Sequence, residues 1–495
     1  MGVIKRQGIL GSLFLYVGVF IGFITSSILF PKILSKEQIG LITTLFSYAI
    51  LFSQIGTLGF NSVTIRMFSY FRDYKNNHNG FFTILLFVIF IGFLVALGLF
   101  FIFKPIMIEQ NIENSPLFVE YIYFLIPIIF FTLIFGLIDT YNTVLFQAVR
   151  GIFLKEFAQR VLILITLIIY YLQVYTFKSF VWAYIMTAAF PALFISLWLV
   201  KDGEFKIKPN RKFITPKLRN SMLNVGLFGI LLGIAGIAAI QIDKIMMSSM
   251  LSLEATGVYA TVFTFAALIR IPSRALLKIA SAVIAEAWKR NDLEEIRNIY
   301  KSTAINQYII ALLVFVGLWA NIDNVFRILP ESYKVGKYVI FFLGIAYTFD
   351  MASGANNNII ASSKYYKYLS WFIFGFLIIV IVSNLIFIPL WGITGVAIAS
   401  AISLIIFIIV RIVFLYHKFG LQPFNYKFLI LSAIGLLSYF ASLLIPQLAN
   451  EYFDIALRSG LITIIYVLLT VAFKISPEVN GIVNTYWRKW KAMKH

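Results

Sequence analysis

Four basic side chains lie within or at the ends of long apolar stretches: Arg66, Arg270, Arg274 and Lys278. A charged residue inside a membrane span costs roughly 2.5–3.5 kcal/mol on insertion scales, so such residues are candidates for function. A guanidinium group suits phosphate because its planar fork binds two oxygens at once. These residues therefore predict a cationic cavity for a phosphate-bearing substrate. The alternative is that they anchor the inner membrane face, with side chains reaching to lipid headgroups.

Acidic residues interrupt the apolar stretches as well. Asp350 is followed by Ser353, and no Lys or Arg lies three or four residues away, so any charged partner must come from another helix. Asp243 precedes Lys244 in the motif QIDK. A carboxylate inside the membrane can carry a proton or coordinate sodium. Asp350, Asp243 and Lys244 are thus candidates for ion coupling or for an outer gate, the alternative being buried polar residues satisfied by neighbouring helices.

Composition defines the elements that must position these residues. The chain is 61% hydrophobic and 13% charged, about half of the roughly 25% charged residues of a soluble domain. Apolar runs of about 20 residues recur along its length, as transmembrane helices require. We predict an all-α polytopic membrane protein with fourteen spans, at residues 8–30, 40–62, 81–103, 117–138, 157–172, 179–199, 225–247, 255–272, 304–320, 338–355, 369–389, 393–415, 428–445 and 456–473.

The distribution of basic residues argues against nucleic-acid binding despite a net charge of +20. If both termini are cytoplasmic, 32 of the 41 Lys and Arg residues fall on the inner side. This bias is the positive-inside rule, and the basic residues would also contact anionic lipid headgroups. The chain contains no cysteine, which excludes disulfides and thiolate metal sites.

A stretch of the sequence occurs twice. LSKEQIGLITTLFSYAILF starts at Leu34 and LSLEATGVYATVFTFAALI at Leu251, with eight identities in the first eighteen positions. The serine and glutamate of each copy, at 35 and 37 and at 252 and 254, predict an N-cap and a favourable first-turn charge. The offset of 217 residues spans six segments, an even number, so both copies have the same orientation. Segments 1–6 and 7–12 then form parallel repeats around a substrate path.

Three stretches resemble a known family. AAIQIDKIMMSSMLSLEATGVYATVFTFAALIRIPSRALLKIASAVIAEAW (238–288), LWGITGVAIASAIS (390–403) and LGFNSVTIRMFSYFRD (58–73) resemble the polysaccharide branch of the multidrug/oligosaccharidyl-lipid/polysaccharide exporter (MOP) superfamily. The resemblance implies a flippase of a bacterial inner membrane. Such a protein moves a polyprenyl-pyrophosphate-linked oligosaccharide to the outer leaflet by alternating access, for surface polysaccharides such as lipopolysaccharide O-antigen. The drug-exporting branch usually has twelve helices, so two additional helices favour the lipid-linked sugar branch.

The sequence therefore predicts two lobes, residues 1–210 and 211–424, followed by a helix pair and a basic cytoplasmic tail over 425–495. Segments 1, 2, 7 and 8 line the cavity. We expect a monomer without cofactor or metal site, coupled to protons, sodium or the membrane potential alone. A cation-coupled drug exporter is the alternative within the superfamily. A membrane glycosyltransferase, polymerase or ligase is disfavoured because the predicted outer loops are short and the loop at 104–116 lacks an Asp-x-Asp pair.

Overall fold

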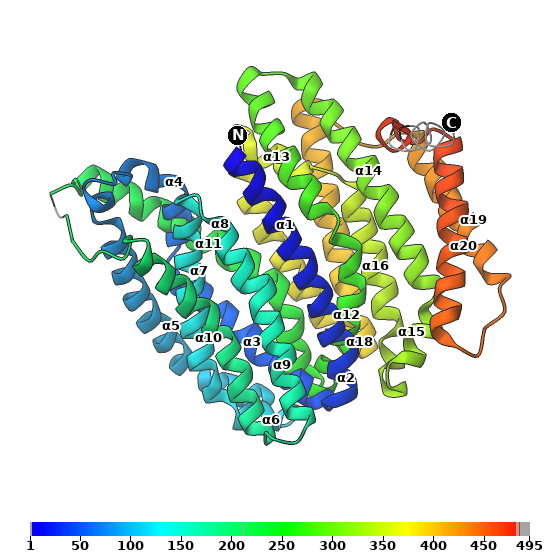
Figure 1. Cartoon of the computed structure of the whole chain (residues 1–495), viewed down its shortest axis with the longest axis horizontal. Coiled ribbons are helices and arrows are strands. Elements are labelled where there is room, and N and C mark those ends of the chain that lie inside the picture. Colours follow the sequence, from blue (N-terminus) through cyan, green and yellow to red (C-terminus); the bar gives the residue numbers. More distant parts are fainter. Residues whose placement is uncertain (1, 211, 482–484, 486–495) are drawn as a thin grey trace. The chain divides into compact units, whose positions relative to one another are not determined.

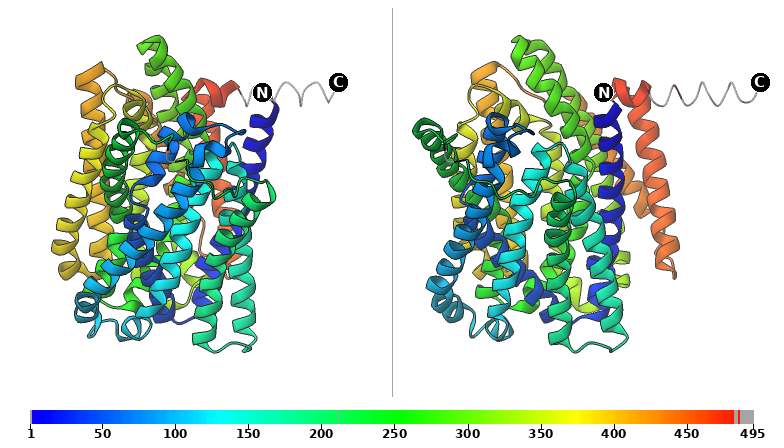
Figure 2. Two further views of the ribbon diagram at one scale, coloured as in Figure 1. Left: turned by 90° about the vertical axis from the view of Figure 1, so that its left-hand side faces the viewer. Right: turned by 60° about the vertical axis from the view of Figure 1, so that its left-hand side comes forward.

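The protein is helical throughout the part of the chain that the structure describes. The computed structural model describes residues 2–210, 212–481 and 485, without the side chains of 2–9, 274 and 275. No strand occurs among these residues. The chain divides into two compact units, Met1–Ala260 and Thr261–His495, and in each the long helices run roughly side by side (Figures 1 and 2). The predicted all-α membrane class is confirmed.

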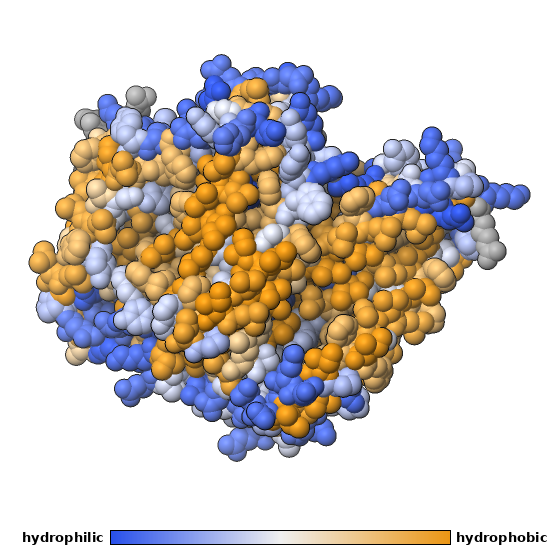
Figure 3. Space-filling view, turned by 180° about the vertical axis from the view of Figure 1, so that it is seen from behind, coloured by the Kyte–Doolittle hydropathy of each residue, from blue (hydrophilic) through white to orange (hydrophobic). Residues whose placement is uncertain are grey.

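Eleven helices among the described residues are long and apolar enough to cross a membrane. The longest, α18 (Tyr368–Phe419), joins predicted segments 11 and 12, and its helical path is interrupted at Gly392 (φ 54°, ψ −128°). Predicted segments 5 and 8 fall on shorter helices. The count of fourteen spans stays a prediction. On the face seen in Figure 3, hydrophobic residues cover the middle of the surface and hydrophilic residues gather along its upper and lower edges, as a bilayer requires.

The first unit contains the helices that precede the second copy of the repeated stretch, and the start of that copy. Its elements are α1 Gly2–Phe23, η1 Ile24–Leu29, α2 Phe30–Ile33, α3 Lys36–Gly56, α4 Phe60–Phe71, η2 Asn77–Gly80, α5 Phe81–Asn111, α6 Pro116–Glu120, η3 Ile122–Phe124, α7 Leu125–Val144, α8 Ala148–Ile152, η4 Phe153–Ala158, α9 Gln159–Tyr171, α10 Phe177–Lys201, α11 Pro216–Met250 and the start of α12 (Leu253–Ala267). An aromatic core joins α4, α5 and α7, where the Phe68 ring meets Phe81 and Tyr141 edge-on.

The second unit contains the rest of α12 and all later elements. These are η5 Leu268–Arg270, α13 Ser273–Arg290, α14 Leu293–Ala320, α15 Ile322–Ile328, η6 Glu331–Gly336, α16 Lys337–Ala352, α17 Asn356–Ser362, α18, α19 Tyr426–Leu443 and α20 Glu451–Ala472. The last two helices pack on α14 through buried residues including Ile309, Ile434 and Ile462. The Tyr466 hydroxyl donates to the Ile309 carbonyl at 2.9 Å. The C-terminal pair is therefore built into this unit rather than attached loosely.

The two copies of the repeated stretch begin as helix N-termini, as predicted. The Ser35 hydroxyl caps α3 by accepting a hydrogen bond from the Gln38 backbone N–H at 3.1 Å. In return, the Gln38 side-chain oxygen accepts a hydrogen bond from the Ser35 backbone N–H. Ser252 accepts from the Ala255 amide at 3.0 Å at the start of α12. These bonds satisfy backbone donors that a helix start leaves free.

Residues 286–301 form parts of two helices, because Asn291 adopts a left-handed conformation (φ 56°) and ends α13. Arg290 pairs with Glu295 across this turn at 2.6 Å. The first compact unit extends to Ala260, beyond residue 210, since α11 packs against α3 and α4. The lobes themselves stay a prediction about the repeats.

Candidate functional site

An ion pair between Arg270 and Asp350 lies in the second unit. The Arg270 guanidinium is 3.0 Å from the Asp350 carboxylate, and 5.0 Å from the centroid of the Tyr347 ring below it. Asp350 and Tyr347 come from α16, while Arg270 ends η5. The charged partner of Asp350 thus comes from another element, as the sequence required. About half of the Arg270 side chain (48%) is exposed, so the guanidinium has donors available beyond this pair.

A second arginine approaches the same carboxylate from the other side. Arg411 of α18 has a nitrogen 3.7 Å from Asp350, and only 6% of its side chain is exposed. Its guanidinium lies 4.2 Å from the Phe407 centroid, and its Nε atom is buried without a hydrogen-bond partner among the described atoms. The Tyr300 hydroxyl is likewise buried without a partner. Two arginines around one carboxylate leave the cluster with a net positive charge, which favours an anionic ligand.

The backbone explains why Arg270 is positioned for this role. Helix α12 ends at Ala267 and continues as the 3-10 turn η5, and Pro272 cannot donate a backbone hydrogen bond at this point. The next helix starts at Ser273, whose hydroxyl donates to the Arg270 carbonyl at 2.7 Å. Lys278 lies exposed on α13, beyond this break, so it does not continue the helical face that carries Arg270. The side chain of Arg274 lies outside the described residues.

Arg66 is not at the end of the second long helix, contrary to the sequence-based assignment. Helix α3 ends at Gly56, and Leu58 and Gly59 then adopt left-handed conformations (φ 48° and 68°). Arg66 lies on the separate amphipathic helix α4, with an exposed side chain that has polar interactions of its own. The positive φ at Leu58 gives no signal in the sequence, since it is rare for a branched side chain.

The pair Asp243–Lys244 belongs to a polar network in the first unit. Asp243 is buried, and the Tyr259 hydroxyl donates to its carboxylate at 3.4 Å. The Lys244 ammonium donates to the Gln241 side-chain oxygen at 3.2 Å, and this oxygen also accepts from the Ser47 hydroxyl at 3.1 Å. The network links α11 to α3 and to the first turns of α12.

The two repeat copies touch each other at equivalent residues within the first unit. Gly40 faces the Leu253 carbonyl so closely that an added Cβ would lie 1.8 Å from the oxygen, and Gly257 faces the Lys36 carbonyl at 1.9 Å. Gly40 and Gly257 are separated by the repeat offset, as are Lys36 and Leu253. The contact is therefore reciprocal, as in a twofold-related interface. An ion pair between Lys36 and Glu254, at 3.1 Å, closes the same ends of α3 and α12.

Sequence reasoning missed three charged residues inside the second unit. Asp454 and Arg458 form a buried pair on α20, at 3.0 Å. Arg411 was counted among the cytoplasmic cations, although it interrupts the apolar run IIFIIVRIVFL. The rule that drew attention to Arg270, a charge within a span, applies equally to Arg411.

No cofactor or metal site can be assigned from the residues present. No group of three or more His, Asp or Glu side chains suited to a metal ion occurs among the described residues. Asp350 is engaged by arginines, which fits an internal counter-charge better than a metal ligand. The expectation of a protein without cofactor or metal stays a prediction.

Two solved structures share the fold over most of the chain. The structure of the lipid II flippase MurJ in an inward closed conformation aligns with a TM-score of 0.71 at 15% identity, covering 94% of this chain and 98% of that one. An inward-facing multidrug resistance MATE family transporter of the MOP superfamily aligns with a TM-score of 0.61 at 14% identity, covering 82% and 94%. No curated protein sequence matches. At these identities the likeness shows the MOP transporter and flippase fold.

A family model also matches. The model described as polysaccharide biosynthesis protein (Polysacc_synt) covers residues 5–287, which is more than half of the chain and includes the two repeat copies, Asp243, Arg66 and Arg270. The resemblance inferred from the sequence is thereby confirmed. With a helical membrane fold of the MOP type and this family match, the chain belongs to the polysaccharide biosynthesis protein family.

Proposed function

We propose that the protein is a flippase for a polyprenyl-pyrophosphate-linked oligosaccharide in a bacterial inner membrane. The observation that supports this most directly is Arg270, half-exposed and paired with Asp350, beside a buried second arginine. A pyrophosphate cannot cross hydrocarbon unpaired, and a guanidinium offers it two donors in a fixed plane. A surface polysaccharide such as O-antigen is the expected destination of the glycan.

The shared carboxylate suggests how binding is coupled to movement. Asp350 holds Arg270 in the absence of substrate, and a pyrophosphate would compete with it for the same guanidinium. Arg411 then keeps Asp350 from being left as an uncompensated buried charge, which would be costly. The two arginines oppose any added positive charge on Asp350, so we propose that a coupling ion reaches this carboxylate only after the substrate has drawn Arg270 away. A proton needs only one carboxylate oxygen, whereas sodium needs several oxygen ligands, so a proton is the coupling ion that we propose.

The glycine crossing and the Asp243–Lys244 network are proposed as the outer gate of an alternating-access cycle. Opening requires the close backbone contact at Gly40 and Gly257 to separate, together with the ion pair between Lys36 and Glu254. The two lobes that move are the predicted repeats of segments 1–6 and 7–12, with segments 1, 2, 7 and 8 along the path. We propose that both termini lie in the cytoplasm, so a reporter fused after Lys208 should report the inner side.

Export by purified protein in liposomes tests this proposal. A fluorescent polyprenyl-pyrophosphate oligosaccharide is added to one leaflet, and its arrival in the other is read with a membrane-impermeant glycosidase. We expect transfer of a chemically unchanged glycolipid, and inhibition by soluble pyrophosphate esters but not by cationic dyes. Efflux of a cationic dye without glycolipid transfer would support the drug exporter that the MATE-type fold allows. A changed mass of the glycolipid would instead indicate an enzyme.

A further inference from the structure

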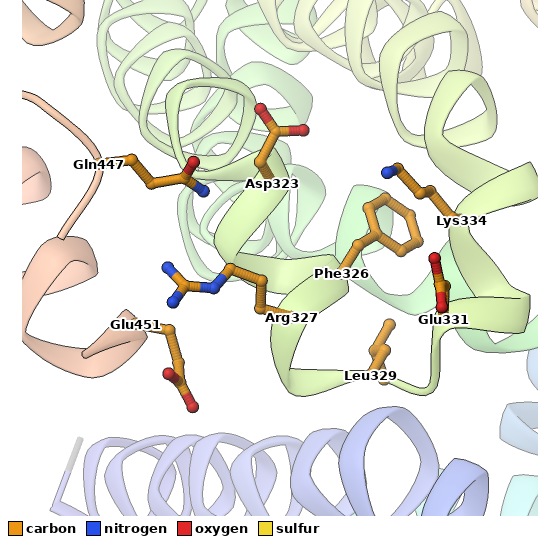
Figure 4. A pocket seen from close by; sticks show the side chains of 8 residues that line it. All are labelled: Asp323, Phe326, Arg327, Leu329, Glu331, Lys334, Gln447 and Glu451. Carbon is orange, nitrogen blue, oxygen red and sulfur yellow. The ribbon is translucent and has the colours of Figure 1, made fainter. Parts of the chain in front are cut away.

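A polar cavity lies at the predicted outer end of the second unit, away from the arginine cluster. Its volume is about 560 Å³, within the range of small-molecule sites. Helix α15, the turn η6 and the connection from α19 to α20 surround it (Figure 4). Its lining comprises Asp323, Phe326, Arg327, Leu329, Glu331, Lys334, Gln447 and Glu451.

The two walls of this cavity are held together by hydrogen bonds, of which the one between Asn324 and Asp454 is buried. Arg327 donates to the Leu448 and Ala449 carbonyls at 2.9 and 2.7 Å, which fixes the connection against α15. The Asn324 side chain of the same helix donates to Asp454 of α20 at 2.8 Å. Fully bonded polar groups of this kind rigidify a structure. The shape of the cavity is therefore fixed by these bonds before a ligand binds.

Four lining side chains remain available inside the fixed walls. Within the described residues, no hydrogen bond or ion pair engages the side chains of Glu331, Lys334, Gln447 or Glu451. Asp323, by contrast, already pairs with Lys337 at 2.8 Å. In Figure 4, Glu331 and Lys334 reach in from η6 while Gln447 and Glu451 approach from the opposite wall. The site thus presents two carboxylates, an ammonium and an amide from facing sides.

The chemistry of the lining discriminates among ligands. Asp323 is neutralised by Lys337, and Glu331 and Glu451 balance Arg327 and Lys334, so the site lacks the net positive charge that suits phosphate at the arginine cluster. A neutral polyhydroxyl compound matches better, since carboxylates accept and the ammonium donates hydrogen bonds in several directions. The Phe326 ring and Leu329 supply the apolar surface that such sites combine with a few polar groups.

We propose that this cavity binds sugar units of the translocated glycan on the outer side of the membrane. The proposal rests on the proposed flippase function, because the oligosaccharide emerges on that side. The C-terminal helix pair then has a task beyond packing, since its connection supplies one wall. A sugar held here would be kept from returning through the path while the arginine cluster releases the pyrophosphate.

Saturation-transfer NMR on the full chain in detergent tests this site. The probes are the methyl glycosides of N-acetylglucosamine, galactose and rhamnose, with glycerophosphoethanolamine as a stand-in for a lipid headgroup. We expect saturation transfer to at least one glycoside. Glu331→Gln and Glu451→Gln should each weaken binding about tenfold, because hydrogen bonds to charged groups are the stronger class. The exposed Glu294→Gln on α14 is the matched control and should bind as the wild type does.

The outcomes separate this site from the arginine cluster. Arg270→Ala should reduce export by roughly 10- to 100-fold and leave glycoside binding unchanged, so failure of one result does not decide the other. No transfer to any glycoside, or equal transfer in both glutamine variants and the wild type, would overturn the proposal. Binding of glycerophosphoethanolamine alone would overturn it in favour of a lipid headgroup site.

Discussion

The two copies of the repeat share a backbone plan but carry different chemistry at equivalent positions. Arg270 corresponds to Ser53 at the offset of 217 residues, and each lies near the point where its long helix breaks. The Ser53 hydroxyl donates within its own helix, to the Ile50 carbonyl at 2.9 Å, whereas Arg270 reaches across to Asp350 at 3.0 Å. The helix break is thus common to both copies, and the charge is specific to the second.

The turns that follow segments 3 and 9 differ in a similar way. In the first unit, Ser115 donates to the Ser248 carbonyl at 2.6 Å, so this turn packs against α11. In the second unit, Asn324 and Arg327 bond to α20 and to the connection that precedes it. The appended helix pair therefore occupies, within the second unit, a packing role that α11 fills in the first. The two repeats thus share the arrangement of their helices, while the charged contacts of Arg270 and Arg327 occur only in the second unit.

The largest expected effect on export comes from Arg270, the position at which the two repeats differ in charge. Arg270→Ala should reduce glycolipid export by roughly 10- to 100-fold, the equivalent of one or two hydrogen bonds to a charged group. Arg270→Lys should recover only part, since lysine keeps the charge but loses the planar fork. Ser53→Ala at the equivalent position should export normally. Full export by the lysine variant at normal protein level would mean that Arg270 is only a topological anchor.

The next effect concerns the carboxylate between the two arginines. Asp350→Asn keeps the shape but removes the counter-charge of the buried Arg411, and breaking a buried pair costs about 3–5 kcal/mol. We therefore expect a lower midpoint of thermal unfolding in detergent as well as lost export. Adding Arg411→Met should restore the unfolding midpoint but not proton-coupled export. An Asn variant with wild-type stability and coupling would contradict the role of Asp350.

The sequence alone predicted the helical class and the repeat, but it predicted only Arg270 and Asp350 of the charged cluster and not Arg411. The caps at Ser35 and Ser252 and the repeat follow from local residue types, and the need for a partner to Asp350 followed from its neighbours. Arg411 was missed because a cation near the predicted end of a span reads as an inner-face anchor. The cavity beside Arg327 could not be predicted, because it depends on carbonyls of residues more than a hundred positions away.

A smaller effect is expected where the repeats are alike. Gly40→Ala and Gly257→Ala should impair export to a similar extent, because each Cβ would meet a carbonyl of the other copy below 2 Å. Overpacking of this kind costs typically about 1–3 kcal/mol. Gly98→Ala and Gly317→Ala have open space at the Cβ and serve as controls, with a slight gain in helix stability. Unequal effects of the two glycine variants would show that the crossing is not reciprocal.

Because the chain lacks cysteine, the same contact can be locked directly. Lys36→Cys with Glu254→Cys places two thiols where an ion pair now joins the ends of α3 and α12. Oxidation to a disulfide should stop export, and reduction should restore it. Undiminished export by the cross-linked protein would exclude this contact as a gate.

The smallest effect distinguishes the inner surfaces of the two units. Arg150 bonds to Asp202 in the first unit, and this bond holds the pKa of the Asp202 carboxyl below its ordinary value of 3.8. The equivalent positions in the second unit are Lys367 and Phe419, which cannot form such a pair. Acid should therefore remove a stabilising contact here that has no counterpart in the other repeat.

The sign of the effect follows from the lowered pKa. A carboxyl whose folded pKa is depressed contributes its stability above the unfolded value and loses it as the pH falls through the folded value. Asp202→Asn should thus lower the unfolding midpoint at pH 7, by the equivalent of up to about 1 kcal/mol for a partly exposed pair. The difference should shrink as the pH falls below 3.8, and it should vanish once the pH is below the lowered folded pKa of Asp202. A constant difference across this range would show that Asp202 acts through packing rather than through its charge.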